Sequence, residues 1–362
     1  MPIPLIDVKA QYEPLLDEVR DRIDGVLEVG RFILGENVHG FEEEVAAYVG
    51  ASHAVGVANG TDAIVLLLDA WGVGPGDEVI CPSFTFYATA EAIARRGATP
   101  VFADIDAATL NLDPADALSR VTPRTKAILA VHLFGRPSPV AELQRGAPVL
   151  EDAAQAFGAG DEGARVGSLG AGATFSFYPT KNLFGLGDGG IVTTSDAGLA
   201  DRVRLLRFHG SRDKELFEAI GYNSRLDELQ AAVLRLFLQH LDRWNAARRE
   251  AAARYEELGL GELCELPADE PGHVYHVYCV RTPERDRVAA ALRARDIACA
   301  TYYSTPLHRQ PVFASLGQEG LPETERAARE TLALPLWPGI TSDQQEQVVE
   351  CVRSALTVGA PS

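Results

Sequence analysis

Short apolar segments alternate with helical segments between residues 53 and 151, and this alternation limits the fold more than any other feature of the chain. Strands that alternate with helices form βαβ units, which place the strands in a mostly parallel sheet. The sequence therefore predicts an α/β fold. The predicted strands are residues 54–57, 78–81, 100–103, 127–131 and 148–150.

Two acidic residues follow the last of these strands. Val149 and Leu150 run directly into Glu151 and Asp152, as at the carboxyl end of a buried parallel strand. Ligands bind at this edge of open α/β sheets, so Asp152 is a candidate binding residue. Asp152 could equally cap a helix after the strand, and its position in the sequence does not decide between the two roles.

Lysine is scarce in this chain, which draws attention to Lys181. Four of the 33 basic residues are lysines, so arginine supplies nearly all of the ordinary positive charge. A lysine amine can lose its proton and condense with an aldehyde, whereas an arginine guanidinium stays protonated. Lys181 is therefore a candidate for bonding a carbonyl cofactor, although a solvated loop lysine is the simpler alternative. The lysines are Lys9, Lys126, Lys181 and Lys214.

A phosphate-binding turn is predicted at Gly60 and Thr61. The pair lies between an apolar strand that ends at Val57 and an apolar helix. Free N–H groups at a helix N-terminus bind phosphate, and glycine lets the backbone come close. The pair is a weak signal alone. Together with Asp152 and Lys181 it indicates pyridoxal phosphate (PLP), whose protonated pyridine nitrogen can pair with a carboxylate.

Ordered motifs over nearly the whole chain resemble those of the DegT/StrS family of PLP-dependent nucleotide-sugar aminotransferases. The resemblance implies an α/β, three-layer PLP-dependent transferase fold of type I, the aspartate aminotransferase type. It implies a large, mostly parallel-sheet domain over residues 1–240 and a smaller C-terminal α+β domain over residues 241–362. The motifs are GRFILG (30–35), FEE (41–43), NGTD (59–62), PSFTFYAT (82–89), EDAAQA (151–156), SFYPTK (176–181), GYNSRLDELQAA (221–232) and PLH (306–308).

The resemblance assigns roles around the cofactor ring. Lys181 is expected to bond to PLP and, once released, to move the substrate proton as general base and acid. Asp152 is expected to keep the pyridine nitrogen protonated, and Gln155 to contact the ring hydroxyl. Phe86 occupies the position of an aromatic side chain that stacks on the ring, with core packing as its alternative.

The resemblance also assigns a phosphate site that two subunits share. Gly60, Thr61 and Ser176 are expected to hold the PLP phosphate together with Asn223 of the other subunit, which would make a homodimer a condition of activity. On the sequence alone, Asn223 could also cap the helix that follows it.

The substrates implied by the resemblance are L-glutamate and a keto-sugar nucleotide, most closely a dTDP- or UDP-linked 3-keto-(6-deoxy)hexose. Residues 187–190 and 209–214 are similar to those of family members that act on 3-keto sugars, whereas 4-keto enzymes more often have Glu in place of Asp188. Residues 302–305 depart from the His-Tyr-Pro run that is commoner in the family before Pro-Leu-His, which leaves the substrate contacts of this segment open. His308 by itself could be an ordinary loop histidine. The candidate substrate-binding residues are Arg31, Arg225 and His308.

Two other functions are compatible with part of this pattern. A related protein could bind PLP as a regulator without turnover, and related sugar dehydratases remove a hydroxyl group instead. The dehydratases usually have histidine at the position of Lys181, and the chain has no basic DNA-binding module. An aminotransferase is therefore the favoured prediction.

The composition argues against several further classes of function. The chain has 51 acidic and 33 basic residues, a net charge of −18, which disfavours a nucleic-acid-binding surface. The five cysteines are scattered and never form a C-x-x-C pair, so we predict neither a metal site nor disulfides. No apolar run reaches membrane-spanning length and the N-terminus lacks a signal-peptide pattern, so we expect a cytoplasmic protein without a membrane partner.

Helical periodicity extends the prediction to both ends of the chain. Apolar residues at helical spacing predict one amphipathic helix over residues 7–29 and a second helix over 41–49. A long helix over residues 225–258 is expected to join the two domains. The small domain is predicted to contain a strand at 276–281 and helices at 285–295 and 342–356.

Overall fold

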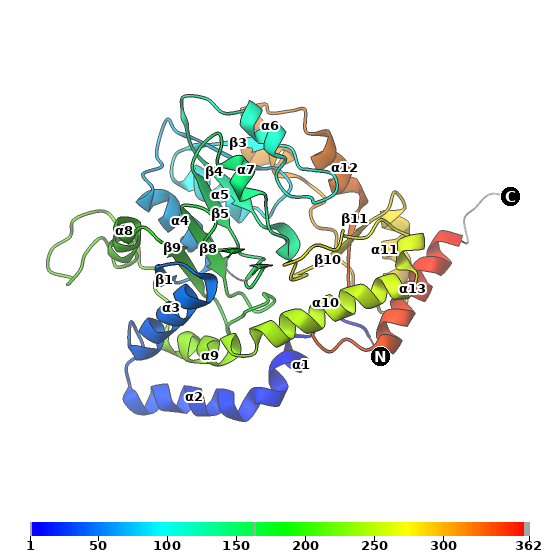
Figure 1. The fold of residues 1–362 in the computed structure, drawn as a ribbon, viewed down its shortest axis with the longest axis horizontal. Coiled ribbons are helices and arrows are strands. Elements are labelled where there is room, and N and C mark those ends of the chain that lie inside the picture. The colour runs from blue at the N-terminus through cyan, green and yellow to red at the C-terminus, as the bar shows by residue number, and fades with distance from the viewer. Residues whose placement is uncertain (1, 162–163, 358–362) are drawn as a thin grey trace.

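A seven-stranded sheet lies at the centre of the computed structural model, which describes residues 2–161 and 164–357 (Figure 1). The strands are β1 (His53–Val57), β2 (Glu78–Pro82), β3 (Thr99–Ala103), β4 (Thr125–Val131), β5 (Val149–Asp152), β8 (Gly172–Ser176) and β9 (Gly190–Thr194). Their order is β1-β9-β8-β5-β4-β2-β3. Only β9 is antiparallel to its neighbours, β1 and β8, and the other pairs are parallel. The prediction of a mostly parallel sheet is confirmed.

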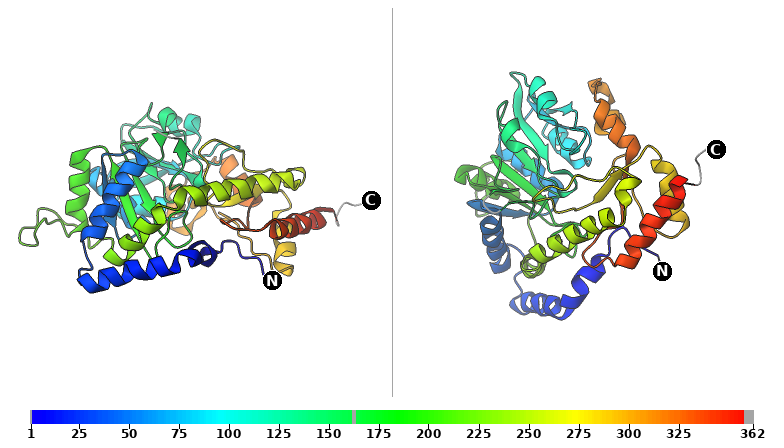
Figure 2. Two further views of the ribbon diagram at one scale, coloured as in Figure 1. Left: turned by 60° about the horizontal axis from the view of Figure 1, so that its bottom comes forward. Right: turned by 45° about the vertical axis from the view of Figure 1, so that its right-hand side comes forward.

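Helices cover both faces of the sheet and give the molecule its three layers (Figures 1 and 2). Successive strand residues point to opposite faces. Val55 of β1 therefore joins the apolar core beneath α4, α5 and α8, whereas Ala54 joins the core beneath α3 and α9. The predicted three-layer α/β fold is confirmed. The covering helices are α3 (Glu36–Val49), α4 (Gly60–Ala70), α5 (Ala88–Arg95), α6 (Pro114–Ser119), α7 (Val140–Leu143), α8 (Ala197–Arg207) and α9 (Glu228–Leu238).

The N-terminal helix is interrupted, so the prediction of one continuous helix over residues 7–29 is wrong. A 3-10 turn (Glu13–Leu15) separates α1 (Val8–Tyr12) from α2 (Leu16–Val29). Pro14 lies in this turn. Proline cannot donate the backbone hydrogen bond that a continuous helix requires, which explains the interruption.

The C-terminal part of the chain has a core of its own, made mainly of apolar residues from its helices and from the antiparallel pair β10 and β11. Its elements are α10 (Leu241–Glu257), β10 (Tyr278–Arg281), α11 (Arg285–Ala294), α12 (Pro322–Glu330), β11 (Thr331–Leu334) and α13 (Ser342–Thr357). The predicted helix over residues 225–258 is divided, because α9 ends at Leu238 and α10 begins at Leu241. The domain boundary at residue 240 stays a prediction, which this break and the separate core support.

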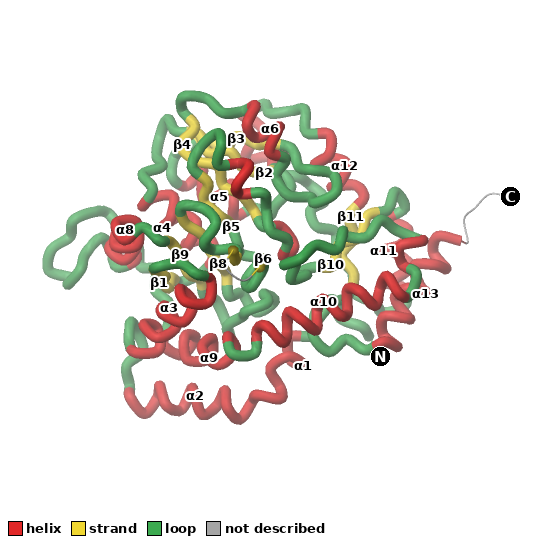
Figure 3. The backbone as a smooth tube through the Cα atoms, in the orientation of Figure 1, coloured by secondary structure: helices red, strands yellow, loops and turns green. Residues whose placement is uncertain are grey.

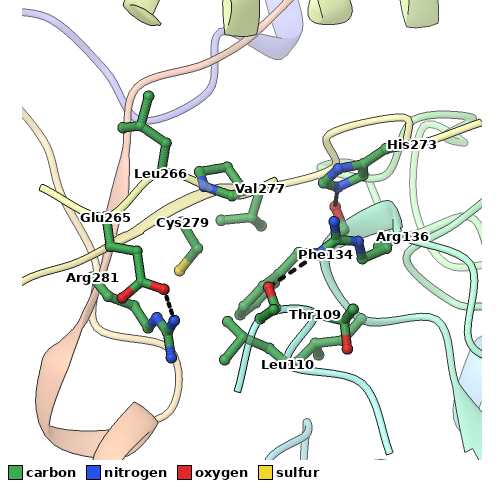
Figure 4. Close-up of a pocket in the computed structure, with 13 residues that line it drawn as sticks. Thr109, Leu110, Phe134, Arg136, Glu265, Leu266, His273, Val277, Cys279 and Arg281 are labelled. Atoms are coloured by element: carbon green, nitrogen blue, oxygen red, sulfur yellow. Dashed lines mark hydrogen bonds and ion pairs between the residues drawn. The ribbon is translucent and has the colours of Figure 1, made fainter. Parts of the chain in front are cut away.

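Arg136 connects the sheet to the C-terminal part, beside a small cavity that Figure 4 shows in close-up. Its side chain is buried after β4, where Nε donates to Glu270 Oε2 at 2.8 Å and Nη2 donates to the Ala268 carbonyl at 3.0 Å. A small cavity beside it is lined by Leu133 and Phe134 from one part and by Val277 and Cys279 from the other. These contacts hold the sheet edge against β10.

Several short elements complete the described part of the chain. Within residues 2–161 and 164–357, no helix is long and apolar enough to cross a membrane. The same residues contain no group of three or more His, Cys, Asp or Glu side chains that could hold a metal ion. The short elements are β6 (Gly160–Asp161), β7 (Ala164–Arg165) and 3-10 turns at Leu133–Gly135, Leu260–Glu262, Leu307–Arg309 and Pro311–Leu316.

Candidate active site

A cavity of about 730 Å³ opens beside the carboxyl ends of β4 and β5. Residues of the C-terminal part, including Val277, Tyr302 and Tyr303, close its other side. This volume is in the range of sites that bind small molecules and cofactors. Seven of the predicted site residues line the cavity: Gly60, Thr61, Phe86, Asp152, Gln155, Ser176 and Lys181.

Lys181 reaches the cavity from a tight turn after β8. The turn is closed by the Lys181 N–H, which donates to the Tyr178 carbonyl at 2.8 Å, and by the Tyr178 N–H, which donates to Ser176 Oγ at 3.3 Å. Burial lowers the pKa of the Lys181 amine to about 8, although the charge of Asp152 acts in the opposite direction. The amine therefore loses its proton at a pH where an ordinary lysine keeps it.

Asp152 lies buried at the end of β5, as expected for a ligand-binding residue at the strand edge. Thr89 Oγ1 donates to Asp152 Oδ2 at 2.7 Å, and the Ala154 N–H donates to Oδ1 at 3.2 Å. Burial raises the pKa of the Asp152 carboxyl, while the hydrogen bond from Thr89 opposes this rise. Turns, not a helix, follow Asp152, so the alternative role as a helix cap is wrong.

The N-terminus of α4 makes a close contact with the end of β8. Asn59 caps this helix by accepting a hydrogen bond from the Asp62 N–H at 2.8 Å. A Cβ atom on Gly60 would lie 2.6 Å from the Ser176 Cβ, so only glycine lets the helix N-terminus approach the Ser176 hydroxyl. The free helix amides, Thr61 and Ser176 together fit a phosphate group.

Gln155 and Phe86 face the space between these groups. Gln155 Oε1 accepts from the Phe134 N–H at 2.9 Å, and its Nε2 donates to the Tyr303 hydroxyl at 3.0 Å. The Phe86 ring is 57% exposed, and it lies 6.5 Å from the Tyr303 ring between centroids. An open aromatic face at this position fits a flat cofactor ring, whereas core packing does not explain such exposure. The contact of Gln155 with a ring hydroxyl stays a prediction.

Asn223 and Arg225 lie outside the cavity lining. Asn223 is exposed in the loop between α8 and α9, where its backbone pairs with Phe208. It does not cap the next helix, because Asp227 occupies the N-cap position of α9. The Arg225 guanidinium carbon lies 5.7 Å from the Phe208 ring centroid. Neither residue is therefore part of the cavity wall that contains Lys181 and Asp152.

Arg31 and His308 also lie away from the cavity lining. The exposed Arg31 donates from Nη2 to the Leu34 carbonyl at 2.5 Å. His308 is buried, with Nδ1 2.7 Å from Ser83 Oγ and Nε2 3.3 Å from Glu325 Oε1. These contacts give His308 a structural role, and the substrate-binding roles of both residues stay predictions.

Several cavity residues were not predicted from the sequence. Thr89, which donates to Asp152 without lining the cavity, had a usable signal because it belongs to the motif that contains Phe86. Leu5, which lines the cavity from the N-terminus, had none. His276 and Tyr303 come from the C-terminal part, where only the fold brings them to the sheet edge. The other lining residues that were not predicted from the sequence include Ile6, Thr85, Val131, Tyr178, Thr180 and Tyr302.

These groups together define a class of protein. An amine of lowered pKa, a buried strand-end carboxylate and a glycine-dependent phosphate site share one cavity of a three-layer α/β fold. This combination is that of PLP-dependent enzymes of fold type I. The model of the DegT/DnrJ/EryC1/StrS aminotransferase family matches residues 15–353, and the chain belongs to this family. It is an aminotransferase, its cofactor is PLP, and the sequence-based assignment is confirmed.

Three similar proteins cover nearly the whole chain. A "Pleiotropic regulatory protein" of Geobacillus stearothermophilus is 49% identical, over 97% of this chain and 97% of that protein. A UDP-N-acetyl-3-dehydro-alpha-D-glucosamine 3-aminotransferase of Acidithiobacillus ferrooxidans is 44% identical, over 98% of each. The crystal structure of S. venezuelae DesV in complex with a ketimine intermediate has a TM-score of 0.94 and 45% identity, over 98% of each chain.

Proposed function

We propose that the protein transfers the amino group of L-glutamate to C3 of a keto sugar carried on a nucleoside diphosphate. The main support for this reaction is that Lys181, Asp152 and the phosphate site at Gly60 and Ser176 lie in one cavity. Several relatives have the names of enzymes that form 3-amino sugars on UDP or dTDP, which supports the acceptor.

Each residue has a defined task in this reaction. When bound, PLP supplies an aldehyde that amines can join and a ring that accepts electron density. Lys181 would hold the cofactor, and its released amine would move a proton between the substrate carbon and the cofactor, away from the donor carbon in the first half of the reaction and onto the acceptor carbon in the second. Asp152 keeps the pyridine nitrogen protonated. Ser176, Thr61 and the backbone at Gly60 hold the phosphate.

Asp188 supports C3 as the aminated carbon. It lines the cavity and lies in the Gly-Asp-Gly-Gly run that is similar to the 3-keto enzymes of the family. Amination at C4 is the alternative acceptor position, and the two outcomes are separated by the experiment below.

The active form is proposed to be a homodimer in which Asn223 of one subunit completes the phosphate site of the other. The loop between α8 and α9 projects from the molecule (Figures 1 and 3). It exposes 69% of Leu216 and 95% of Ile220. Apolar side chains of this size on a projecting loop support burial against a second copy of the chain. This arrangement would explain why Asn223 lies outside the cavity of its own subunit.

The proposed compartment is the cytoplasm. All five cysteines are free, and four of them are buried thiols. Free thiols suit a reducing compartment, where disulfides are rare.

A spectroscopic experiment tests the function. L-glutamate should discharge the visible band of the purified holoenzyme, and after removal of the donor a 3-keto nucleotide sugar should restore it. A 4-keto sugar in a second cuvette identifies the position, and Lys181→Ala serves as the inactive control. If glutamate leaves the band unchanged, the donor assignment is wrong. If no amino acid discharges it, the protein binds PLP without transamination, as a regulator would.

A further inference from the structure

His276 lines the same cavity as Lys181, and the reaction described above does not use it. The ring is buried just before β10, in the C-terminal part of the chain. It contacts Asn182, the residue that follows Lys181, with 3.2 Å between His276 Nδ1 and Asn182 Oδ1. A residue of the C-terminal part is thereby connected to the turn that carries the reactive amine.

The orientation of Asn182 determines which ring nitrogen carries the hydrogen. Asn182 Nδ2 donates to Asn245 Oδ1 at 2.7 Å and to the Val274 carbonyl at 2.9 Å. Both partners are acceptors, so the atom that faces His276 is the Asn182 oxygen. An amide oxygen can only accept, so His276 Nδ1 must donate. In the neutral ring, Nε2 is then a hydrogen-bond acceptor.

The surroundings keep the His276 ring neutral. Burial lowers the pKa of His276 well below its ordinary value, and the positive charges of Lys181 and Arg248 lower it further. Among the described residues, no group donates a hydrogen bond to His276 Nε2. The Nε2 atom is nevertheless not completely buried, because it is absent from the fully buried polar atoms that have no hydrogen-bond partner. The acceptor at Nε2 therefore remains available on the cavity side.

We propose that His276 is a positioning residue for Lys181. Its Nε2 accepts a hydrogen bond from the Lys181 amine whenever that amine is not bonded to the cofactor. The bond from Nδ1 to Asn182 fixes the ring, so the acceptor and the lysine turn move as one unit. The released amine is held beside the cavity after it takes the proton from the donor carbon and until it passes that proton on.

The first test uses capture of PLP by the apoprotein, followed by the rise of the visible band at a series of pH values. An acceptor favours the protonated amine over the neutral one. His276→Phe should therefore shift the midpoint of capture to lower pH than in the wild type, while His276→Gln, which keeps an acceptor, should shift it less. His273→Phe is the matched control, because His273 is a buried histidine beside the other cavity (Figure 4).

The second test measures discharge of the holoenzyme by L-glutamate in a single turnover. Loss of one hydrogen bond to a reacting amine should slow this step about tenfold in His276→Phe. If His276→Phe folds, and both its midpoint and its rate match the His273→Phe control, the proposal is overturned. If His276→Phe does not fold, His276→Ala with added imidazole decides. Recovery of the rate supports the positioning role, and no recovery overturns it. Capture of PLP requires neither the donor nor the sugar, so failure of the proposed substrates leaves this test intact.

Discussion

The lysine amine and the carboxylate of the cavity influence each other through burial. Removing Lys181 from water disfavours its charged form, and removing Asp152 from water disfavours the carboxylate. The two charges attract one another and partly offset both effects. The result is an amine that can act as a nucleophile near neutral pH, next to a carboxyl that can pair with a protonated ring nitrogen.

The pKa of Lys181 predicts how cofactor capture depends on pH. Only the neutral amine attacks an aldehyde, so the rate at which apoprotein captures PLP should rise with pH and reach half of its maximum near pH 8. Stopped-flow absorbance with the apoprotein measures this rate. A midpoint near the ordinary lysine value would contradict the prediction, and Lys181→Ala should show no capture at any pH.

At the scale of elements, one carboxylate holds two helices together. Glu228, in the first turn of α9, accepts hydrogen bonds from the N–H groups of Gly35 at 2.7 Å and Val38 at 2.9 Å, at the start of α3. It also accepts from the N–H of Asn37 at 3.0 Å. This contact explains why α3 begins at Glu36 and not at the predicted residue 41. The signal lies far along the chain, so helical spacing alone could not provide it.

Glu228→Ala should lower the free energy of unfolding by roughly 3 kcal/mol, because it leaves several buried amides without an acceptor. Urea denaturation of the wild type and the variant measures the difference. Asp227→Ala is the matched control, since Asp227 is exposed and makes no side-chain cap bond, and it should cost at most about 0.5 kcal/mol. Equal effects of the two substitutions would contradict this account.

At the scale of the whole molecule, the proposed dimer predicts complementation between two inactive subunits. Lys181→Ala and Asn223→Ala should each be impaired alone, because each lacks one group in both sites. In a hybrid dimer, one site lacks both groups and the other site lacks neither. After complete subunit exchange of equal amounts, roughly a quarter of the wild-type activity should therefore appear.

The exchange itself must be shown, with differently tagged subunits that co-purify. Activity equal to the mean of the unmixed parents, after exchange has been shown, would mean that Asn223 acts within its own subunit. The distance of Asn223 from the cavity lining would then need another explanation.

By itself, the sequence determined the parallel sheet, the family and the residues at the strand ends. These features are local patterns in the chain: the alternation of strands and helices, the acidic strand end at Asp152, the lysine Lys181 of its motif, and the Gly60-Thr61 turn. The structure brings Asp152, Lys181, Gly60 and Thr61 to one cavity. The interruption of the N-terminal helix also has a local cause, because Pro14 is visible in the sequence, whereas only the tertiary structure decided where the helix toward the C-terminal part divides. It also brought His276 and Tyr303 to the cavity, because contacts between distant segments arise from packing and leave no periodic signal in the chain.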